Sequence, residues 1–292
     1  GRQPILDSFL GSNGATVAVP SWSSIVGATA SEIPSETSAQ TVNNITTKKQ
    51  VATRQLRVNA WGSNDLTSAF NGVDPMTAIG NQVVEYWNIE KQDLLLATMN
   101  GVIADNVAND SGDLVNDISA GVGDAAKISS DAVIDTKFLL GDRQDKFTAI
   151  AMHSKPYQRL CKLNLIDFTP TNAQNIGFGT YLGMTVIVND KMPVSSGDYT
   201  TVMFQPSAFG YGESSNGIIP VEMDRNAGTG AGIDELYSRT QFAMHPNGFS
   251  WLNASVADPN DIPTTAELAL AVNWNRVFEK KNCGFVALVT AE

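Results

Sequence analysis

The sequence predicts an α+β fold in which one long helix is combined with a series of short strands. Two observations support this prediction. Apolar residues recur at helical spacing across residues 75–109, and several other segments alternate between apolar and polar residues as half-buried strands do. The chain has 292 residues, of which 42% are hydrophobic. It is therefore long enough for one large domain or two ordinary ones with buried cores.

The composition argues against several classes of protein. Lys and Arg total 19 against 30 Asp and Glu, which gives a formal net charge of −11. Because phosphate repels an acidic chain, we expect no sequence-specific binding of nucleic acid, although a container for nucleic acid stays open. Cys161 and Cys283 lie far apart, so we expect two reduced, buried thiols and no disulfide framework. No apolar stretch approaches the roughly 20 residues that span a bilayer, so we expect no membrane partner.

The N-terminal part of the chain predicts an irregular arm followed by a long hairpin. Residues 1–19 are rich in Gly, Ser and Asn, and "ATVAVPSW" (15–22) alternates like a short edge strand that ends near Pro20. A polar tract follows, and alternation returns in "VATRQLRVNAW" (51–61). We therefore interpret residues 20–60 as a two-stranded extended loop. A lone hairpin is barely stable in water, so this one needs a surface on which to lie.

The charge of this loop differs from that of the whole chain. Its second half, residues 41–60, contains no acid and carries four cations: Lys48, Lys49, Arg54 and Arg57. Because the rest of the chain is acidic, these residues are candidate inter-subunit contacts with a second copy of the chain. We expect the segment to find no place on its own molecule. A solvated basic hairpin is the alternative interpretation.

Residues 75–109 predict a single long helix. Asp74 can cap the free N–H groups, and Pro75 suits the first turn. An unbroken helix of this length would extend about 50 Å at ~1.5 Å per residue, which is longer than one small core requires. Gly80 and Gly101 each weaken the helix by roughly 1 kcal/mol relative to Ala. They are therefore candidate hinges.

The remainder of the chain predicts shorter elements. We expect a loop over residues 110–130 and short helices over 131–140, capped by Ser130, and over 155–164, with Pro156 in its first turn. The predicted strands are 147–152, 179–190, 199–209, 220–226, 235–246 and 275–290, with a helix at 264–273 before the last one.

His153 and Ser154 are the candidates for nucleophilic catalysis, with Cys161 nearby. Adjacent residues on a strand point to opposite faces, so we expect no hydrogen bond between the side chains of His153 and Ser154. The chain has no G-x-S-x-G motif, and Ser154 is better explained as the cap of the helix that Pro156 opens. We therefore expect a structural or interface histidine, no catalytic residues and no enzyme. A hydrolase using Ser154 or Cys161 is the less favoured alternative.

The sequence also offers weak candidates for a metal or phosphate site. The candidate metal ligands are Asp105, Asp110, Asp113, Asp117 and His245. The aspartates miss the spacing of a calcium loop and lack the Glu at its twelfth position, and two histidines without suitable cysteines supply a transition metal poorly. The stretch "GTGAG" (228–232) has no following Lys, so it is expected to be a flexible tip. We expect no metal and no cofactor.

Several segments, in this order, are similar to those of one protein family. They are "TVAVPSW", "NNITTKKQVATRQLRVNAW", "DLTSAFNGVDPMTAIGNQVVEYW", "LLGDRQDKFTAIAMHSKPYQRLCKLNLI", "GTYLGMTVIVND", "PVEMDRN", "QFAMHPNGFSW" and "LALAVNWNRVFEKKNCGFVALV". With this order and spacing, the chain resembles the major capsid proteins of tailed bacteriophages. These proteins share the fold named after phage Hong Kong 97.

The resemblance implies a division of the chain into parts. They are an N-terminal arm (1–19), an extended loop that lies over an adjacent subunit (20–60), a peripheral domain (61–124 and 263–292) with a spine helix (75–109), and an axial domain (125–262).

The resemblance also implies a function. The chain would assemble as hexamers and pentamers into the icosahedral shell that encloses the double-stranded DNA genome of a tailed bacteriophage. Scaffold, portal and decoration proteins would be its partners, the virion its location and the host bacterial cytoplasm its place of assembly. Some family members join subunits by Lys–Asn links, for which Lys48 or Lys49 are candidates. An encapsulin-like compartment with a protein cargo is the main alternative, and a secreted β-rich adhesin is a further one.

Overall fold

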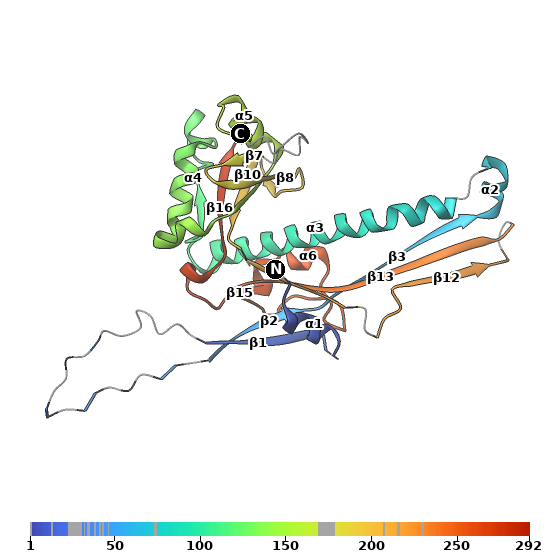
Figure 1. Ribbon diagram of the computed structural model, residues 1–292, viewed down its shortest axis with the longest axis horizontal. Coiled ribbons are helices and arrows are strands. Elements are labelled where there is room, and N and C mark those ends of the chain that lie inside the picture. The colour runs from blue at the N-terminus through green and yellow to red at the C-terminus, as the bar shows by residue number, and fades with distance from the viewer. Residues whose placement is uncertain are drawn as a thin grey trace.

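The computed structural model shows an elongated molecule with three parts around one long helix (Figure 1). The structure describes residues 2–12, 14–22, 47–72, 75–168, 179–206, 208–214, 217–228 and 231–292, together with residues 31, 33, 36–37, 39–40, 42 and 44–45. We call the parts the lobe, which contains the C-terminus, the ribbon, which runs beside the helix, and the arm, which projects away from both.

The long helix α3 (Pro75–Asn109) begins and ends where the sequence predicts. Asp74, its expected cap, lies outside the described residues. The C-terminal half of α3 is an interior helix, since Leu94, Met99 and Val102 are at most 1% exposed. Val107, in the last turn of α3, is 55% exposed. Burial in the helix therefore extends to Asp105 and Asn106 and ends there.

Gly101 has a packing role in α3. A Cβ atom at this position would lie 2.1 Å from the carbonyl oxygen of Leu268 and 2.6 Å from Nε1 of Trp274. The indole of Trp274 crosses the helix here and donates a hydrogen bond of 2.8 Å to that same carbonyl. Gly101 thus allows a close approach, and the hinge expected here stays a prediction. At Gly80 a Cβ would meet nothing within 4 Å, and a hinge there stays a prediction.

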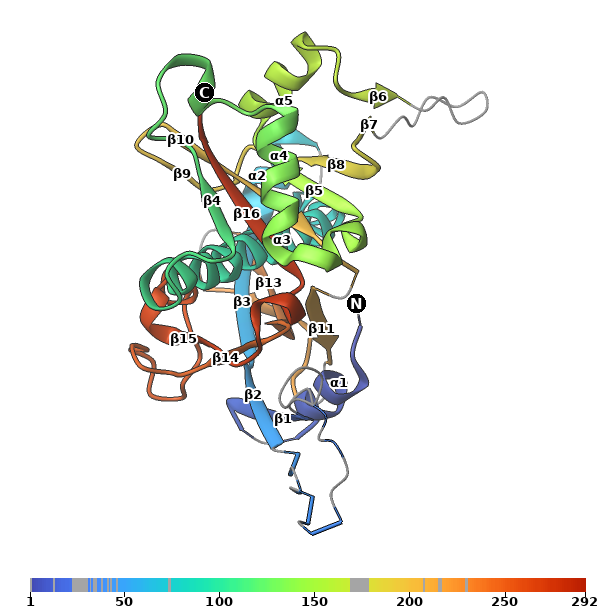
Figure 2. The same ribbon diagram turned by 90° about the vertical axis from the view of Figure 1, so that its left-hand side faces the viewer.

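The lobe contains an eight-stranded sheet. Its strand order is β4 (Val115–Asp117), β16 (Phe285–Ala291), β10 (Asp198–Phe204), β5 (Ala149–Met152), β8 (Met184–Val188), β7 (Gly179–Tyr181) and β6 (Asp167–Phe168), with β9 (Val194–Ser195) paired to β10. The helix α4 (Ser130–Lys137) packs on β4 and β16, as Figure 2 shows. Ser129 and not Ser130 caps this helix.

Two expectations for the lobe are corrected by its hydrogen bonding. The loop expected over residues 110–130 contains β4, which pairs in parallel with β16. The last strand expected over 275–290 is two strands, β15 (Trp274–Arg276) and β16, separated by a 3₁₀ turn at Lys280–Asn282. The pairing of β4 with β16 joins segments far apart in the chain, so no local periodicity reveals it.

The ribbon is built on the long strand β13 (Ile233–Pro246). One edge of β13 pairs with β12 (Val221–Asn226) and β11 (Phe209–Glu213), and the other edge pairs with β3 (Gln55–Asn64). The helix α2 (Asp65–Asn71) lies at the end of the ribbon far from the lobe (Figure 1). The strand expected over 51–61 is therefore divided at Arg54, and its second half belongs to the ribbon.

The sheets join segments that are distant in sequence. Strand β16 pairs with β10 of the lobe, and strand β13 pairs with β3 and runs beside α3 (Figure 1). The expected division into a peripheral domain (61–124 and 263–292) and an axial domain (125–262) stays a prediction.

The arm is the hairpin of β1 and β2 together with the residues between them, and the N-terminal segment, residues 2–12, lies beside its base. Strands β1 (Thr16–Trp22) and β2 (Thr47–Thr53) pair antiparallel, with Thr16 opposite Thr53. Residues 1–19 were expected to be irregular, but Pro4–Leu10 forms the helix α1. Pro4 suits its first turn, and its apolar residues repeat at helical spacing.

The remaining elements lie below the C-terminal half of α3. Strand β14 (Phe249–Trp251) pairs with β15, and Trp251 packs edge-on against Trp274 at 5.0 Å between ring centroids. The helix expected at 264–273 is a short helix, α6 (Thr265–Leu268), followed by a 3₁₀ turn at Ala271–Asn273. Thr264 and Glu267 form a capping box, which fixes the start of α6.

Candidate assembly surfaces

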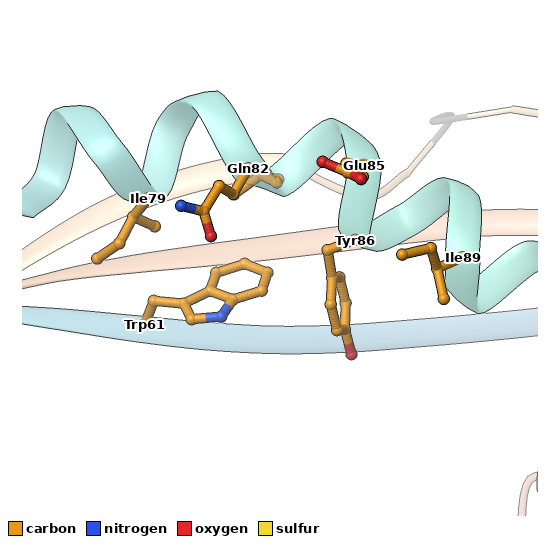
Figure 3. Close-up of a pocket in the computed structure, with 7 residues that line it drawn as sticks. Trp61, Ile79, Gln82, Glu85, Tyr86 and Ile89 are labelled. Atoms are coloured by element: carbon orange, nitrogen blue, oxygen red, sulfur yellow. The ribbon is translucent and has the colours of Figure 1, made fainter.

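An apolar groove lies between the N-terminal half of α3 and strand β3 (Figure 3). It encloses about 300 Å³ and is lined by Trp61, Ile79, Gln82, Val83, Glu85, Tyr86 and Ile89. The rings of Trp61 and Tyr86 meet edge-on, with centroids 5.2 Å apart. Figure 3 shows these two rings side by side below the helix, with Ile79 and Ile89 beyond them.

The helix is anchored to the ribbon next to the groove. Trp87 is buried, and its Nε1 donates a hydrogen bond of 2.8 Å to Oγ of Ser238 on β13. Other apolar side chains of this half of the helix face solvent: Val84 is 68% exposed, and Ile89, which lines the groove, is 43% exposed. Exposed apolar side chains at a groove make it a candidate site of interaction.

The arm projects at the end of the molecule opposite α2 (Figure 1). Several of its described residues are apolar and exposed. Among the described residues between β1 and β2, Ile33 is 91%, Val42 is 83% and Ile45 is 49% exposed. Trp22, at the end of β1, is 66% exposed. Because the arm projects away from the ribbon, these side chains do not reach the groove of their own molecule.

Three of the four basic residues at or near the base of the arm contact their own chain, contrary to expectation. They are Lys48, Arg54 and Arg57. Lys48 Nζ donates to the carbonyl of Val277 at 2.8 Å, and Arg57 donates to that of Pro263 at 2.7 Å. Arg54 donates to the carbonyls of Phe9 and Ser12, and its guanidinium lies 5.2 Å from the ring centroid of Phe9.

The expectation that this segment finds no place on its own molecule is therefore wrong for Lys48, Arg54 and Arg57. Lys49 on β2 is exposed. Local charge did not reveal the intrachain contacts, because their acceptors are main-chain carbonyls on segments far away in sequence. Inter-subunit contact by Lys48, Lys49, Arg54 and Arg57 stays a prediction.

The base of the arm is also joined to the ribbon through His245. Gln50 on β2 uses Oε1 to accept from the backbone N–H of Gly248 at 2.9 Å, and the same oxygen lies 3.2 Å from Nε2 of His245. Nε2 must therefore carry the proton. Burial lowers the pKa of His245 to about 4, so the ring is neutral at pH 7. His245 thus links β13 to the arm as a neutral hydrogen-bond donor.

His153 forms the cap of α5 (Ser154–Lys162), a role expected of Ser154. His153 Nδ1 accepts the backbone N–H of Lys155 at 3.2 Å. Ser154 Oγ lies 3.3 Å from the same nitrogen, so the expectation that these side chains cannot meet is wrong. It failed because Ser154 begins the helix and does not continue the strand. The lone pair that a general base would need is already shared with the N–H of Lys155.

The other chemical candidates have structural partners. Arg276 pairs with Asp110 at 3.1 Å and with Asp113 at 2.6 Å, which explains why these carboxylates gather after α3. Cys283 is buried as expected, and burial raises the pKa of its thiol to about 12. Cys161 is half-buried, and both cysteines are free. Part of the tip at 228–232 lies outside the described residues.

The long helix beside a ribbon, with a lobe on one side and a projecting arm, is the fold of phage capsid proteins. The structure resembles the capsid of Ralstonia phage GP4, with a TM-score of 0.63 and 8% identity over 99% of this chain and 86% of that one. It also resembles the capsid of cyanophage Pam1, with a TM-score of 0.60 and 10% identity over 97% and 87% of the two chains. The expected Hong Kong 97-type α+β fold is thus confirmed.

Sequence comparison identifies the family. The profile of the Gp13-like family, "Major capsid protein 13-like", matches residues 77–286. The major capsid protein of Bacillus phage SPP1 is 34% identical over 278 residues, which cover 94% of this chain and 82% of that protein. The chain therefore belongs to the Gp13-like family of phage major capsid proteins. In the described part of the chain, no helix is long and apolar enough to cross a membrane.

The sequence interpretation missed two features of these surfaces. The groove beside α3 was not foreseen, because helical periodicity does not distinguish a core face from an exposed face that lines a groove. The helix α1 was overlooked, although "PILDSFL" carries Leu6, Phe9 and Leu10 at helical spacing after Pro4. That spacing was the available signal for α1.

Proposed function

We propose that copies of this chain associate head to tail into a closed icosahedral shell, the arm of one copy filling the groove of the next. The observation that carries this proposal is the separation of two exposed apolar surfaces, Ile33, Val42 and Ile45 on the arm and the groove beside α3 (Figure 1). A contact between different patches on two copies is heterologous, and it closes into rings where the rotation permits. Hexamers and pentamers are such rings.

The basic residues of the arm base support the same contact. Lys49 is exposed on β2, whereas the chain as a whole has a net charge of −11. The groove includes Glu85, and Glu90 lies on the same half of α3. In this proposal Lys48, Lys49, Arg54 and Arg57 face acidic surface of the adjacent copy, which favours correct orientation more than raw affinity.

We further propose that the lobe is the axial part of the subunit and that α3 with the ribbon is its peripheral part. The role is structural and not enzymatic. The shell encloses double-stranded DNA, forms in the host bacterial cytoplasm and works with scaffold, portal and decoration proteins. A net charge of −11 suits a container that must release its DNA. The relationship to a phage capsid protein at 34% identity favours this role over an encapsulin-like compartment.

Substitution of Ile89 tests the assembly surface. Ile89→Glu places a charge in the groove, and because Ile89 is 43% exposed the subunit should fold as before. We expect shells to be lost from electron micrographs and sedimentation profiles while the subunit keeps its circular dichroism spectrum.

Val107→Glu is the matched control, since Val107 is 55% exposed at the other end of the same helix. Shells formed equally well by both variants would contradict the proposed contact.

Binding of duplex DNA by purified subunits is a separate measurement. We expect little retention of DNA at physiological salt, and tight retention would contradict the role of a passive container.

A further inference from the structure

The N-terminal segment packs its apolar side chains into a small core of its own. Leu6, Phe9 and Leu10 are at most 4% exposed and meet Ala52 of β2 and Ala243 of β13. This cluster is separate from the main core of the molecule. Its partly buried neighbours are two residues of β1, Val17 and Val19. Strand β1 therefore packs against the small core that α1 completes.

Polar side chains from the body bind the last carbonyls of α1. Gln241 Nε2 donates to the carbonyl of Leu10 at 2.7 Å in a buried position, and Arg54 donates to those of Phe9 and Ser12. Carbonyls at a helix end have no partner within the helix, and Gln241 supplies one for Leu10. The carbonyl of Phe9 also accepts from the backbone N–H and the hydroxyl of Ser12, so Arg54 adds a further donor there. The recognition combines apolar pockets with main-chain contacts.

The floor of the site is shaped for this helix. A Cβ atom on Gly212 would lie 2.6 Å from Cβ of Leu6, and one on Gly210 would lie 2.7 Å from Cδ of Gln3. Two further bonds fix the register, from Gln3 N to the carbonyl of Tyr211 at 2.9 Å and from Glu213 N to Oδ1 of Asp7 at 3.0 Å. Strand β11 thus carries glycines where the helix comes closest.

A helix of seven residues is not stable alone in water, so α1 depends on the surface that receives it. We propose that the surface formed by β2, β11 and β13, which we call the α1 site, binds a peptide. It would take an amphipathic segment with the spacing of Leu6, Phe9 and Leu10. Its occupant is residues 2–12 of the same chain, and its occupation clamps β1 onto the body. This inference concerns the single subunit and does not depend on the assembly contact proposed above.

We expect β1 to depend on the contact with α1, and β2 and the strands beneath it to be held by other contacts. Strand β2 has other anchors, because Val51 N donates to Oγ of Ser250 at 3.1 Å and Gln50 is held at His245. Strand β1, by contrast, has only β2 as a pairing partner in the described structure, and its Val17 and Val19 pack on the small core that α1 completes. When α1 leaves the α1 site, β1 is therefore the first strand to lose its contacts.

Hydrogen exchange on the full-length, unassembled chain tests the clamp. The variant Phe9→Ser removes α1 from the α1 site. We expect amides of residues 16–22 to exchange at least tenfold faster, while those of β14 and β15 exchange as before. Ile5→Ser is the matched control, because Ile5 lies in the same helix and is 50% exposed. Unchanged protection of residues 16–22 in a variant whose N-terminal segment exchanges freely would overturn the proposed clamp.

Binding in trans tests the site itself. A fluorescein-labelled peptide of residues 2–12 should bind the Phe9→Ser chain saturably and restore protection of residues 16–22. The same peptide carrying Phe9→Ala should bind at least tenfold more weakly. Adding Gly212→Val to the vacated chain should block binding, since the new side chain occupies the position of Leu6. Equal affinity for both peptides, or no binding to a chain with the wild-type near-ultraviolet spectrum, would overturn the site.

Discussion

The two halves of α3 belong to one continuous helix but have opposite environments. In the C-terminal half, Leu94, Met99 and Val102 are at most 1% exposed and lie in the main core. In the N-terminal half, Trp87 is buried, whereas Val84 and Ile89 face solvent beside the groove. One helix therefore serves two purposes. Its second half packs in the core of the subunit, and its first half carries the surface that we propose contacts another copy.

The largest difference between the halves is expected at their glycines. Gly101→Ala forces a Cβ into the Leu268 carbonyl and the Trp274 indole, so we expect a loss of more than about 3 kcal/mol in the free energy of unfolding. Gly80→Ala meets nothing and should stabilise the helix by about 1 kcal/mol. Urea denaturation of both variants measures the two effects. Equal effects at both positions would remove the distinction.

Truncation of apolar side chains gives the next largest contrast. Met99→Ala leaves a cavity in the core and should cost about 2–5 kcal/mol, whereas Ile89→Ala should cost less than about 1 kcal/mol. Chemical denaturation of the unassembled subunit measures both values. If Ile89→Ala proved as costly as Met99→Ala, the first half of α3 would belong to the interior.

The interior also predicts a dependence of the free energy of unfolding on pH, through the buried ring of His245. Because burial lowers the pKa of His245 to about 4 from an ordinary value of 6.5, the unfolded chain takes up a proton first as the pH falls. Stability is therefore highest above pH 6.5 and falls towards pH 4, and we expect a loss of about 2 kcal/mol between pH 7.5 and 5 from this residue.

Denaturation midpoints at several pH values, compared with those of His245→Gln, measure this effect. The variant should show a shallower decline over the same range, because it lacks the titrating ring. A decline of the same slope in both proteins would assign the pH dependence to other groups.

The sequence predicted those parts of the fold that local patterns encode. Both ends of α3 follow from the helical spacing of its apolar residues. Strands β12 and β13 follow from alternation and the Gly-rich turn between them. The Hong Kong 97-type fold itself came from the resemblance of ordered segments. The lobe's β4 was missed because three residues carry too little periodicity to distinguish a strand from a loop.

The candidate surfaces were harder to predict because they depend on pairing between distant segments. The break at Arg54, which sends β2 to the arm and β3 to the ribbon, has no signal in the alternation of residues 51–61. The cations of the arm base were identified, but not their main-chain acceptors. The groove beside α3 needs the ribbon beneath the helix, and only the pairing of β3 with β13 supplies it.

A structure of the assembled shell, resolved to side chains, would show whether the arm fills the groove of an adjacent copy. We expect residues of the arm, Ile33, Val42 or Ile45, to lie within van der Waals contact of Trp61 and Tyr86 on that copy. A shell in which this groove stays open to solvent, or is filled by residues of its own subunit, would contradict it.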